Sequence, residues 1–271
     1  MEYVNTTDYT KMTNNTGFST GTITFVHDNN VVMNYPTTTV GSVFASRVHA
    51  EKIFRTIITF MIDANLVRGN IIDAGCWIGD NALVWSKNIK NIVYAIDPSQ
   101  ENIEFVKTMI ELNNITNIVT IQTALSDKNQ IISTNDTPFL GPGGTNHCTF
   151  ELHDKNAHKV QACSLDELYF NNQITNIGFI HLDVEGFESF VLHGSQTILS
   201  QYRPVVAFEQ HLTTDDYVSL AEWFKSQEYL CVLIDETFKG TRKDCRNLLA
   251  LPRENDYQSL LSRFKPQLIV L

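Results

Sequence analysis

The chain of 271 residues contains few cysteines and no apolar run long enough to cross a membrane. Its five cysteines, at positions 76, 148, 163, 231 and 245, are odd in number and form no C-x-x-C pair. This spacing argues against a disulfide framework or a zinc site, and it suits a reducing compartment. The N-terminus lacks the basic start and apolar stretch of a signal peptide, and the most apolar stretch, 53–62, contains an arginine and two threonines. We therefore predict a cytoplasmic protein that does not enter a membrane.

Positive charge is also scarce in this sequence. Lys and Arg total 20 against 30 for Asp and Glu, which gives a formal net charge of −10. Binding to nucleic acid or to an acidic membrane surface requires clustered Lys and Arg, and the sequence has no such cluster. Hydrophobic residues make up 43% of the chain, which is enough for one buried core. The expected partner is a small-molecule or glycan substrate, and the expected state is a monomer or homodimer.

The first 66 residues read as an extension of the main domain. A polar lead-in rich in Thr and Asn occupies 1–22, and two short strands around an Asp-Asn-Asn turn follow within 22–36. A helix is predicted over about 45–66, because its apolar residues recur at helical spacing.

Short apolar stretches then alternate with longer amphipathic ones. Seven strands are predicted at 70–75, 91–97, 117–124, 177–184, 204–210, 229–235 and 247–252. Helices are predicted between them at 79–88, 99–113, 187–200 and 214–227. Such alternation indicates a doubly wound α/β fold, with a mostly parallel seven-stranded sheet covered on both faces over 67–252. The tail, 253–271, is expected to pack on this domain, and 135–160 is expected to be a long functional loop.

The stretch "IIDAGCWIGD" at 71–80 joins the first of these strands to a helix. It lacks the G-x-G-x-x-G of a dinucleotide loop and the G-x-x-x-x-G-K-[ST] of a P-loop. The helix N-terminus can still hold one carboxylate, and Asp97 at the end of the next strand can accept both hydroxyls of a ribose. A ribose and a carboxylate without phosphate describe S-adenosylmethionine. The alternative is that Gly75 and Gly79 only permit a tight turn and that Asp97 caps the helix after it.

The carboxyl ends of parallel strands are where ligands bind in such sheets. The candidate cofactor-binding residues at these ends are Asp73, Gly75, Cys76, Trp77, Gly79, Asp80, Asp97, Pro98, Ala124, Leu125, Asp127 and Asp183.

Several blocks of the sequence resemble the FkbM-type methyltransferases, which belong to the class I S-adenosylmethionine-dependent superfamily. The resemblance spans about 70–210 and is carried by "IIDAGCWIGDNAL", "VYAIDPSQENIEFVKTMIELNN", "TALSD", "VQACSLDEL" and "HLDVEGFESFVLHGSQTIL…RPVVAFE". It implies a Rossmann-like class I fold and O-methylation of a sugar, a polyketide or another natural product. Three departures from the family pattern stand out. Cys76-Trp77 replaces a small pair, Asp97 replaces a commoner Glu, and His181 stands where the family often has Lys.

Methyl transfer from a sulfonium to an alcohol needs alignment and a proton acceptor. The candidates are His181, Asp183, Glu185, Glu209 and His211, with His181 and Asp183 favoured. A regular strand would place His181, Asp183 and Glu185 on one side of the sheet. The alternatives are that His181 is a hydrogen-bonded core residue, and that Glu185 and Glu188 cap the next helix. No metal ligands are assigned, and a divalent cation held by these groups is the less favoured reading.

Two other functions remain open at this level. One is a nucleotide-dependent enzyme of another class on a similar sheet, against which the missing G-x-G-x-x-G argues. The other is a non-catalytic, methyltransferase-like binding module.

Overall fold

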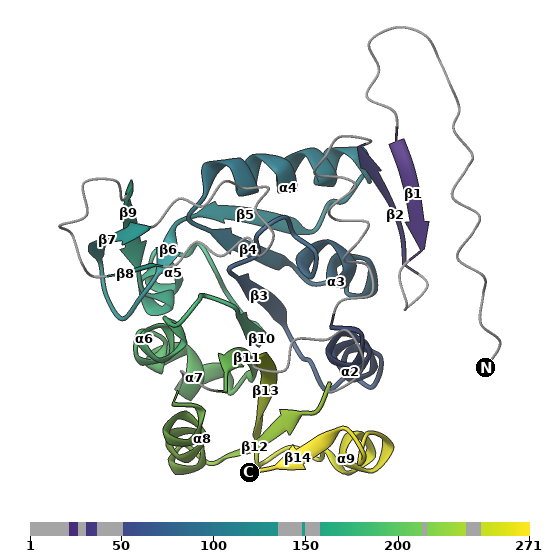
Figure 1. The fold of residues 1–271 in the computed structure, drawn as a ribbon, viewed down its shortest axis with the longest axis vertical. Helices are drawn as coiled ribbons and strands as arrows, with labels where there is room; N and C mark the ends of the chain where they lie inside the picture. The colour runs from purple at the N-terminus through teal and green to yellow at the C-terminus, as the bar shows by residue number, and fades with distance from the viewer. Residues whose placement is uncertain are drawn as a thin grey trace, which may run out of the picture.

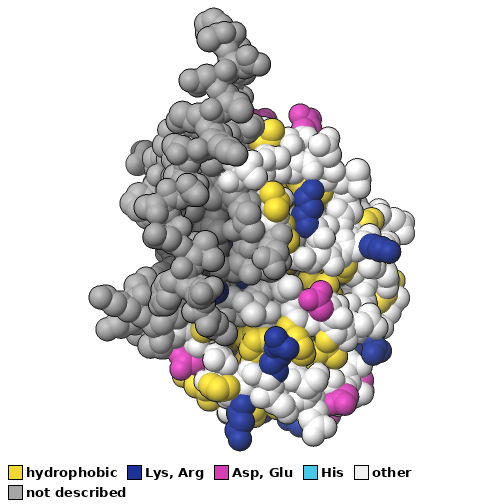
Figure 2. All heavy atoms as spheres, turned by 90° about the vertical axis from the view of Figure 1, so that its right-hand side faces the viewer, with side chains coloured by type: hydrophobic (Ala, Val, Ile, Leu, Met, Phe, Trp, Pro, Cys, Tyr) yellow, Lys and Arg dark blue, Asp and Glu magenta, His cyan; other side chains and the backbone are white. Residues whose placement is uncertain are grey.

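A computed structural model describes residues 22–26, 31–36, 51–134, 148–149, 158–212, 216–236 and 245–271 (Figure 1). The lead-in over 1–21 and most of the predicted loop over 135–160 lie outside these residues. No helix in the described part is long and apolar enough to cross a membrane. On the face drawn in Figure 2, the Lys and Arg side chains of the described residues are dispersed and form no basic patch.

An eight-stranded sheet forms the centre of the molecule, in the order β14-β12-β13-β11-β10-β3-β4-β5. Its strands are β3 (Asn70–Ala74), β4 (Val93–Asp97), β5 (Ile118–Gln122), β10 (Ile177–Leu182), β11 (Val205–His211), β12 (Tyr229–Ile234), β13 (Cys245–Pro252) and β14 (Leu268–Val270). The five strands from β5 to β11 are parallel, and the other three pair antiparallel. The order reverses beside β3, so a ligand site is expected at the carboxyl ends of β3 and β10.

This arrangement confirms the doubly wound, mostly parallel α/β fold, but the predicted count of seven strands is wrong. The eighth strand is β14, whose residues pair with the outer edge of β12. With only three residues, β14 is too short to be read from periodicity, and its strand conformation depends on pairing with that edge.

Helices cover both faces of the sheet because its strands alternate between two apolar sides. Phe179 of β10 joins the core with α2 (Lys52–Asp63), α3 (Ala82–Asn88), α4 (Gln100–Leu112) and α9 (Gln258–Arg263). Ile180 joins the opposite core with α5 (Leu165–Phe170), α6 (Glu188–His193), α7 (Gln196–Tyr202) and α8 (Tyr217–Ser226). The single helix predicted over 187–200 is therefore two helices, which are divided at Gly194. A Cβ atom at Gly194 would lie 2.4 Å from the carbonyl oxygen of Ser126, so the close approach requires glycine.

A second, smaller sheet lies beside the main one, in the order β6-β9-β7-β8. Its strands are β6 (Ala124–Leu125), β7 (Gln130–Thr134), β8 (Cys148–Thr149) and β9 (His158–Cys163). The strand predicted over 117–124 is thus shared between β5 of the large sheet and β6 of the small one. The sequence gives no sign of this division, since the two strands are separated by Thr123 alone.

The predicted N-terminal hairpin is confirmed as β1 (Thr22–Val26) paired antiparallel with β2 (Val32–Pro36). Its buried residues, Met33 and Tyr35, pack against side chains of α3 and α4. The Asn113 side chain donates to the backbone oxygen of Asn34 at 2.9 Å and accepts from its N–H at 2.7 Å. These bonds hold the hairpin beside α3 and α4 (Figure 1).

Candidate active site

The turn between β3 and α3 is shaped by residues with positive φ. Gly75 has φ 74°, and a Cβ atom there would lie 1.7 Å from the carbonyl oxygen of Asp183. The N–H groups of Gly75 and Cys76 both donate to the carbonyl oxygen of Ile96, at 2.9 and 3.0 Å. The turn therefore lies against the ends of both β4 and β10, and only glycine permits that approach at position 75.

Asp97 anchors this turn from the end of β4. Its Oδ2 accepts from the N–H of Trp77 at 2.9 Å, while Oδ1 accepts from the N–H of Ser99 at 2.8 Å and from Asn102 Nδ2 at 2.9 Å. The residue is only 5% exposed, and burial raises the pKa of its carboxyl group to about 6 even though these bonds favour the charged form. The cap of α4 is the Ser99 side chain, which accepts from the N–H of Asn102. Asp97 supports the turn as well as ending the strand.

A buried hydrogen bond joins β3 to β10. Asp73 Oδ1 and His181 Nδ1 are 2.8 Å apart, and the imidazole lies against the rings of Phe54 and Trp85, with ring centroids 5.2 and 5.4 Å away. Burial opposes the charged imidazole, but the bond to Asp73 and the nearby carboxylates outweigh it, so the pKa of His181 is raised. Asp73 Oδ2 and His181 Nε2 are buried and have no hydrogen-bond partner among the described residues.

Carboxyl groups gather where β10 and β11 end. Strand β10 stops at Leu182, and Glu185 and Gly186 follow with φ of 53° and 96°, so the regular alternation expected up to Glu185 does not occur. Asp183 is half-buried and hydrogen-bonds to the carboxylate of Glu209. Burial, followed by the charges of Glu209 and Glu185, raises the pKa of Asp183 well above its usual range. Asp183 and Glu209 thus form a hydrogen-bonded pair of carboxyl groups at the strand ends.

Three potential metal ligands meet at the end of β11. A carboxylate oxygen of Glu209, a ring nitrogen of His211 and the sulfur of Cys245 all lie within 4.8 Å of one another. The Nε2 atom of His211 is also 3.8 Å from Oε2 of Glu185. These three side chains supply oxygen, nitrogen and sulfur donors where β11 ends and β13 begins.

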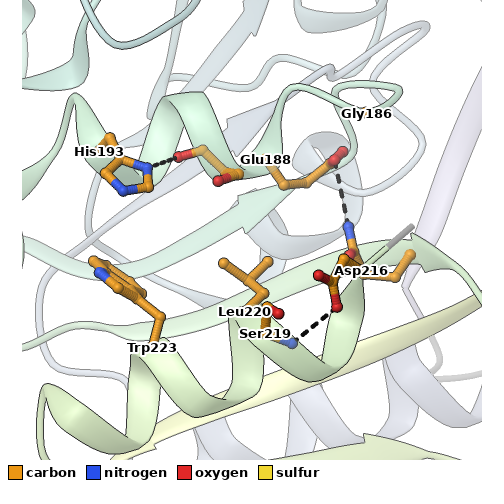
Figure 3. A pocket seen from close by; sticks show the side chains of 9 residues that line it. Gly186, Glu188, His193, Asp216, Ser219, Leu220 and Trp223 are labelled. Carbon is orange, nitrogen blue, oxygen red and sulfur yellow. Dashed lines mark hydrogen bonds between the residues drawn. The ribbon is translucent and has the colours of Figure 1, made fainter.

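A cavity of about 340 Å³ lies between α6 and α8, on the face of the sheet that α5 to α8 cover (Figure 3). It is lined by Gly186, Glu188, Ser189, His193, Gln210, Asp216, Ser219, Leu220 and Trp223. Glu188 is buried, accepts from the N–H of Val184 at 3.0 Å and lies 3.4 Å from Gln210 Nε2. The cavity adjoins the strand ends through Gly186 and Gln210 and combines an indole ring with hydroxyl, amide and carboxylate groups.

A family model described as the methyltransferase FkbM domain matches residues 73–231. The chain belongs to this FkbM family. This match confirms the resemblance to FkbM-type methyltransferases that was inferred from the sequence over about 70–210.

Solved structures of methyltransferases are similar to this chain at low sequence identity. Methyltransferase FkbM from Methylobacillus flagellatus KT is 18% identical, with a TM-score of 0.49 over 67% of this chain and 43% of that one. An O-methyltransferase from Bacillus cereus in complex with SAH is 11% identical, with a TM-score of 0.46 over 78% and 87% of the two chains. An rRNA methylase from Streptococcus thermophilus is 10% identical, with a TM-score of 0.46 over 74% and 94%. The chain spans less than half the length of the first of these structures. No curated protein sequence matches it.

The structure places the sequence-based candidates of this FkbM-family chain in several different environments. Asp73, Gly75, Asp97 and Asp183 lie together around the turn after β3, through the contacts given above. The ring of His181 lies in the core, and the residue is 2% exposed. This placement agrees with the alternative that His181 is a hydrogen-bonded core residue.

The candidate Asp80 is held by contacts that the sequence did not predict. Asp80 Oδ2 accepts from Arg55 Nη2 at 2.7 Å, and Arg55 Nε donates to Asn81 Oδ1 at 2.9 Å. Arg55 is 7% exposed and ties α2 to the start of α3. An arginine in an amphipathic helix is expected to face solvent. The helical pattern therefore did not predict the contact of Arg55 with Asp80 and Asn81.

Ala124, Leu125 and Asp127 lie in and beside the small sheet, whereas Pro98 and Cys76 follow β4 and β3 of the large sheet. Ala124 and Leu125 are buried in β6, where Leu125 pairs with Cys163 of β9. The carboxylate of Asp127 accepts from Gln130 Nε2 at 3.0 Å and closes the turn to β7. Pro98 is half-buried, next to Asp97. Burial, with the nearby charges of Asp97 and Asp73, raises the pKa of the Cys76 thiol well above its usual value, so Cys76 contributes to the turn as a neutral side chain.

Proposed function

We propose that the protein is an S-adenosylmethionine-dependent O-methyltransferase that acts on a hydroxyl group of a small molecule, glycan or natural product. The observation that carries this proposal is the pairing of the Gly75 turn with Asp97 at the ends of adjacent strands. The turn offers the N-terminal end of α3, which suits a carboxylate, and Asp97 suits a ribose. Membership of the FkbM methyltransferase family supports the same reaction.

The residues present fit the amino-acid end of this cofactor. Asp73 Oδ2 is a buried oxygen that no described residue satisfies. Such a group costs about 1–3 kcal/mol when it stays unpaired, so a bound ammonium group would be stabilised there. His181 then acts as a positioning residue, since its bond to Oδ1 fixes the orientation of the carboxylate. When bound, the cofactor would supply the activated methyl group.

The proton acceptor is assigned to the side chains at the ends of β10 and β11, and not to His181 in the core. Asp183 and Glu209 contact each other beside the Gly75 turn, and both are only half-buried. Glu185 and His211 lie next to them and remain candidates for the same role. A hydroxyl acceptor placed at this edge would lose its proton to a carboxylate as the carbon–sulfur bond breaks and the new carbon–oxygen bond forms.

The preference for a hydroxyl-rich acceptor rests on the resemblance to the FkbM family, whose members typically methylate hydroxyl groups of sugars and other natural products. The cavity between α6 and α8 lies on the other face of the sheet from Glu209 and is not assigned to the acceptor.

A labelling experiment tests the proposal. Purified enzyme is incubated with methyl-deuterated S-adenosylmethionine and a fractionated metabolite and glycan extract, and products are followed by mass spectrometry. The expected result is an enzyme-dependent product that gains one labelled methyl group, together with S-adenosylhomocysteine. Tight binding of NAD with no binding of S-adenosylhomocysteine would exclude the proposal and revive the nucleotide-dependent alternative. Binding of S-adenosylhomocysteine without turnover on any fraction would favour the non-catalytic module.

A further inference from the structure

We propose that Glu209, His211 and Cys245 form a binding site for a thiophilic divalent cation, with Zn²⁺ the best-suited ion. Their donor atoms lie within 4.8 Å of one another, and they supply one carboxylate oxygen, one imidazole nitrogen and one sulfur. Zinc is bound in proteins by these three ligand types, and sites with three protein ligands keep a further position open. Soft sulfur and borderline imidazole donors disfavour Mg²⁺ and Ca²⁺.

The strand pairing holds these ligands in place. His211 of β11 and Cys245 of β13 are directly opposite each other in an antiparallel pair. Glu209 precedes His211 by two residues on the same strand, so its side chain lies on the same face. Opposite side chains on one face of such a pair have Cβ atoms about 4.5–5.5 Å apart. Donors around a tetrahedral zinc ion are about 3.3–3.7 Å apart, given bond lengths of about 2.0–2.3 Å. Small side-chain rotations would therefore close the set around an ion.

The charge around the cluster favours a cation. Oε2 of Glu185 is 3.8 Å from Nε2 of His211, and the carboxyl group of Asp183 hydrogen-bonds to Glu209. Three acidic side chains thus lie close together at the ends of β10 and β11, and Glu185 and Glu209 are near the imidazole. A divalent ion bound to Glu209 would offset their mutual repulsion. Where the proposed function holds, the open position would lie beside the acceptor site, and an oxygen bound there would become more acidic.

The site is tested by metal binding alone, without cofactor or acceptor, so the result is independent of the proposed methyl transfer. Untagged full-length protein is stripped with chelator, dialysed and titrated with Co²⁺ and Zn²⁺. We expect about one ion per chain and a thiolate-to-cobalt charge-transfer absorption that Zn²⁺ displaces.

Three variants make the test specific. Cys245→Ser should abolish the charge-transfer absorption, and His211→Asn should weaken Co²⁺ binding by about 10–100-fold or more, since even changes outside the ligand shell reach that range. Cys163→Ser, a half-buried thiol on β9 outside the cluster, is the matched control and should retain the absorption. Circular dichroism confirms that each variant is folded, and His211→Asn serves if Cys245→Ser does not fold. Wild-type protein that binds no Co²⁺, or a folded Cys245→Ser protein with unchanged absorption, would overturn the proposal.

Discussion

Asp97 is the side chain on which cofactor affinity should depend most. Replacement by Ala removes the proposed charged acceptor for the ribose and also releases the Trp77 N–H that holds the turn. We expect S-adenosylhomocysteine binding to weaken by about 1.5–3 kcal/mol, the usual scale for a hydrogen bond to a charged group. Titration calorimetry measures this loss. Asp63→Ala, an exposed carboxylate at the end of α2, should leave the affinity unchanged.

The same residue predicts how binding depends on pH. Burial raises the pKa of Asp97 to about 6, so its carboxyl group takes up a proton as the pH falls below that value. The protonated form cannot accept hydrogen bonds from both ribose hydroxyls, and affinity should therefore fall as the pH is lowered. Between pH 7 and pH 5 the dissociation constant should rise about tenfold, which follows from the ionised fraction. An equally steep rise in the folded Asp97→Asn protein would show that another group is responsible.

Asp183 should affect turnover and leave cofactor binding almost unchanged. Asp183→Asn keeps the shape of the side chain and removes the carboxyl pair with Glu209. We expect kcat to fall by about 10²–10⁴-fold, the range for loss of a general acid–base group. Steady-state kinetics and calorimetry on one preparation separate the two effects, with Asp63→Asn as the control. Normal kcat would move the role of base to Glu185, Glu209 or His211.

At the level of elements, the turn between β3 and α3 depends on one close approach. A Cβ atom at Gly75 would overlap the carbonyl oxygen of Asp183, whereas one at Gly186 meets nothing within 4 Å. Both glycines have positive φ, so their alanine variants share the backbone strain and differ in the steric clash. We expect Gly75→Ala to lower the free energy of unfolding by about 3 kcal/mol or more, and Gly186→Ala by about 1 kcal/mol. Urea titration compares the two, and equal losses would mean that the contact is unimportant.

The sequence predicted elements well where their signal is local. The spacing of Asp73, Gly75 and Asp97 lies within two consecutive strands and their turns, and these residues do meet in the structure. Contacts between distant segments were missed for a physical reason. Cys245 reaches His211 only because β13 runs antiparallel to β11, and the spacing of cysteines along the chain does not report that pairing. Strand alternation predicted that His181, Asp183 and Glu185 would lie on one side of the sheet, but β10 ends at Leu182, so the alternation does not extend to the last two residues.

For the molecule as a whole, ligand binding should appear as stabilisation. A ligand that binds only the folded chain adds about 2.7 kcal/mol at a concentration of 100 times its dissociation constant. For a protein of this size that corresponds to a rise in Tm of about 5–10 °C. S-adenosylhomocysteine should produce this shift in differential scanning calorimetry, and NAD at the same concentration should not. A shift with NAD alone would argue against the proposed cofactor.

The contact between Gly75 and Asp183 also bears on the order in which the chain folds. Strands β3, β4 and β5 are the first strands of the large sheet to be synthesised, but the residue that packs on the Gly75 turn, Asp183, follows β10 and is made more than a hundred residues later. Contacts between segments so far apart form slowly, because the loop between them must close first. A nascent chain that has completed β5 therefore has the glycine turn without its binding site. Under the proposed function, S-adenosylmethionine would bind only after the halves of the sheet on either side of β3 have joined, and its capture would report that joining.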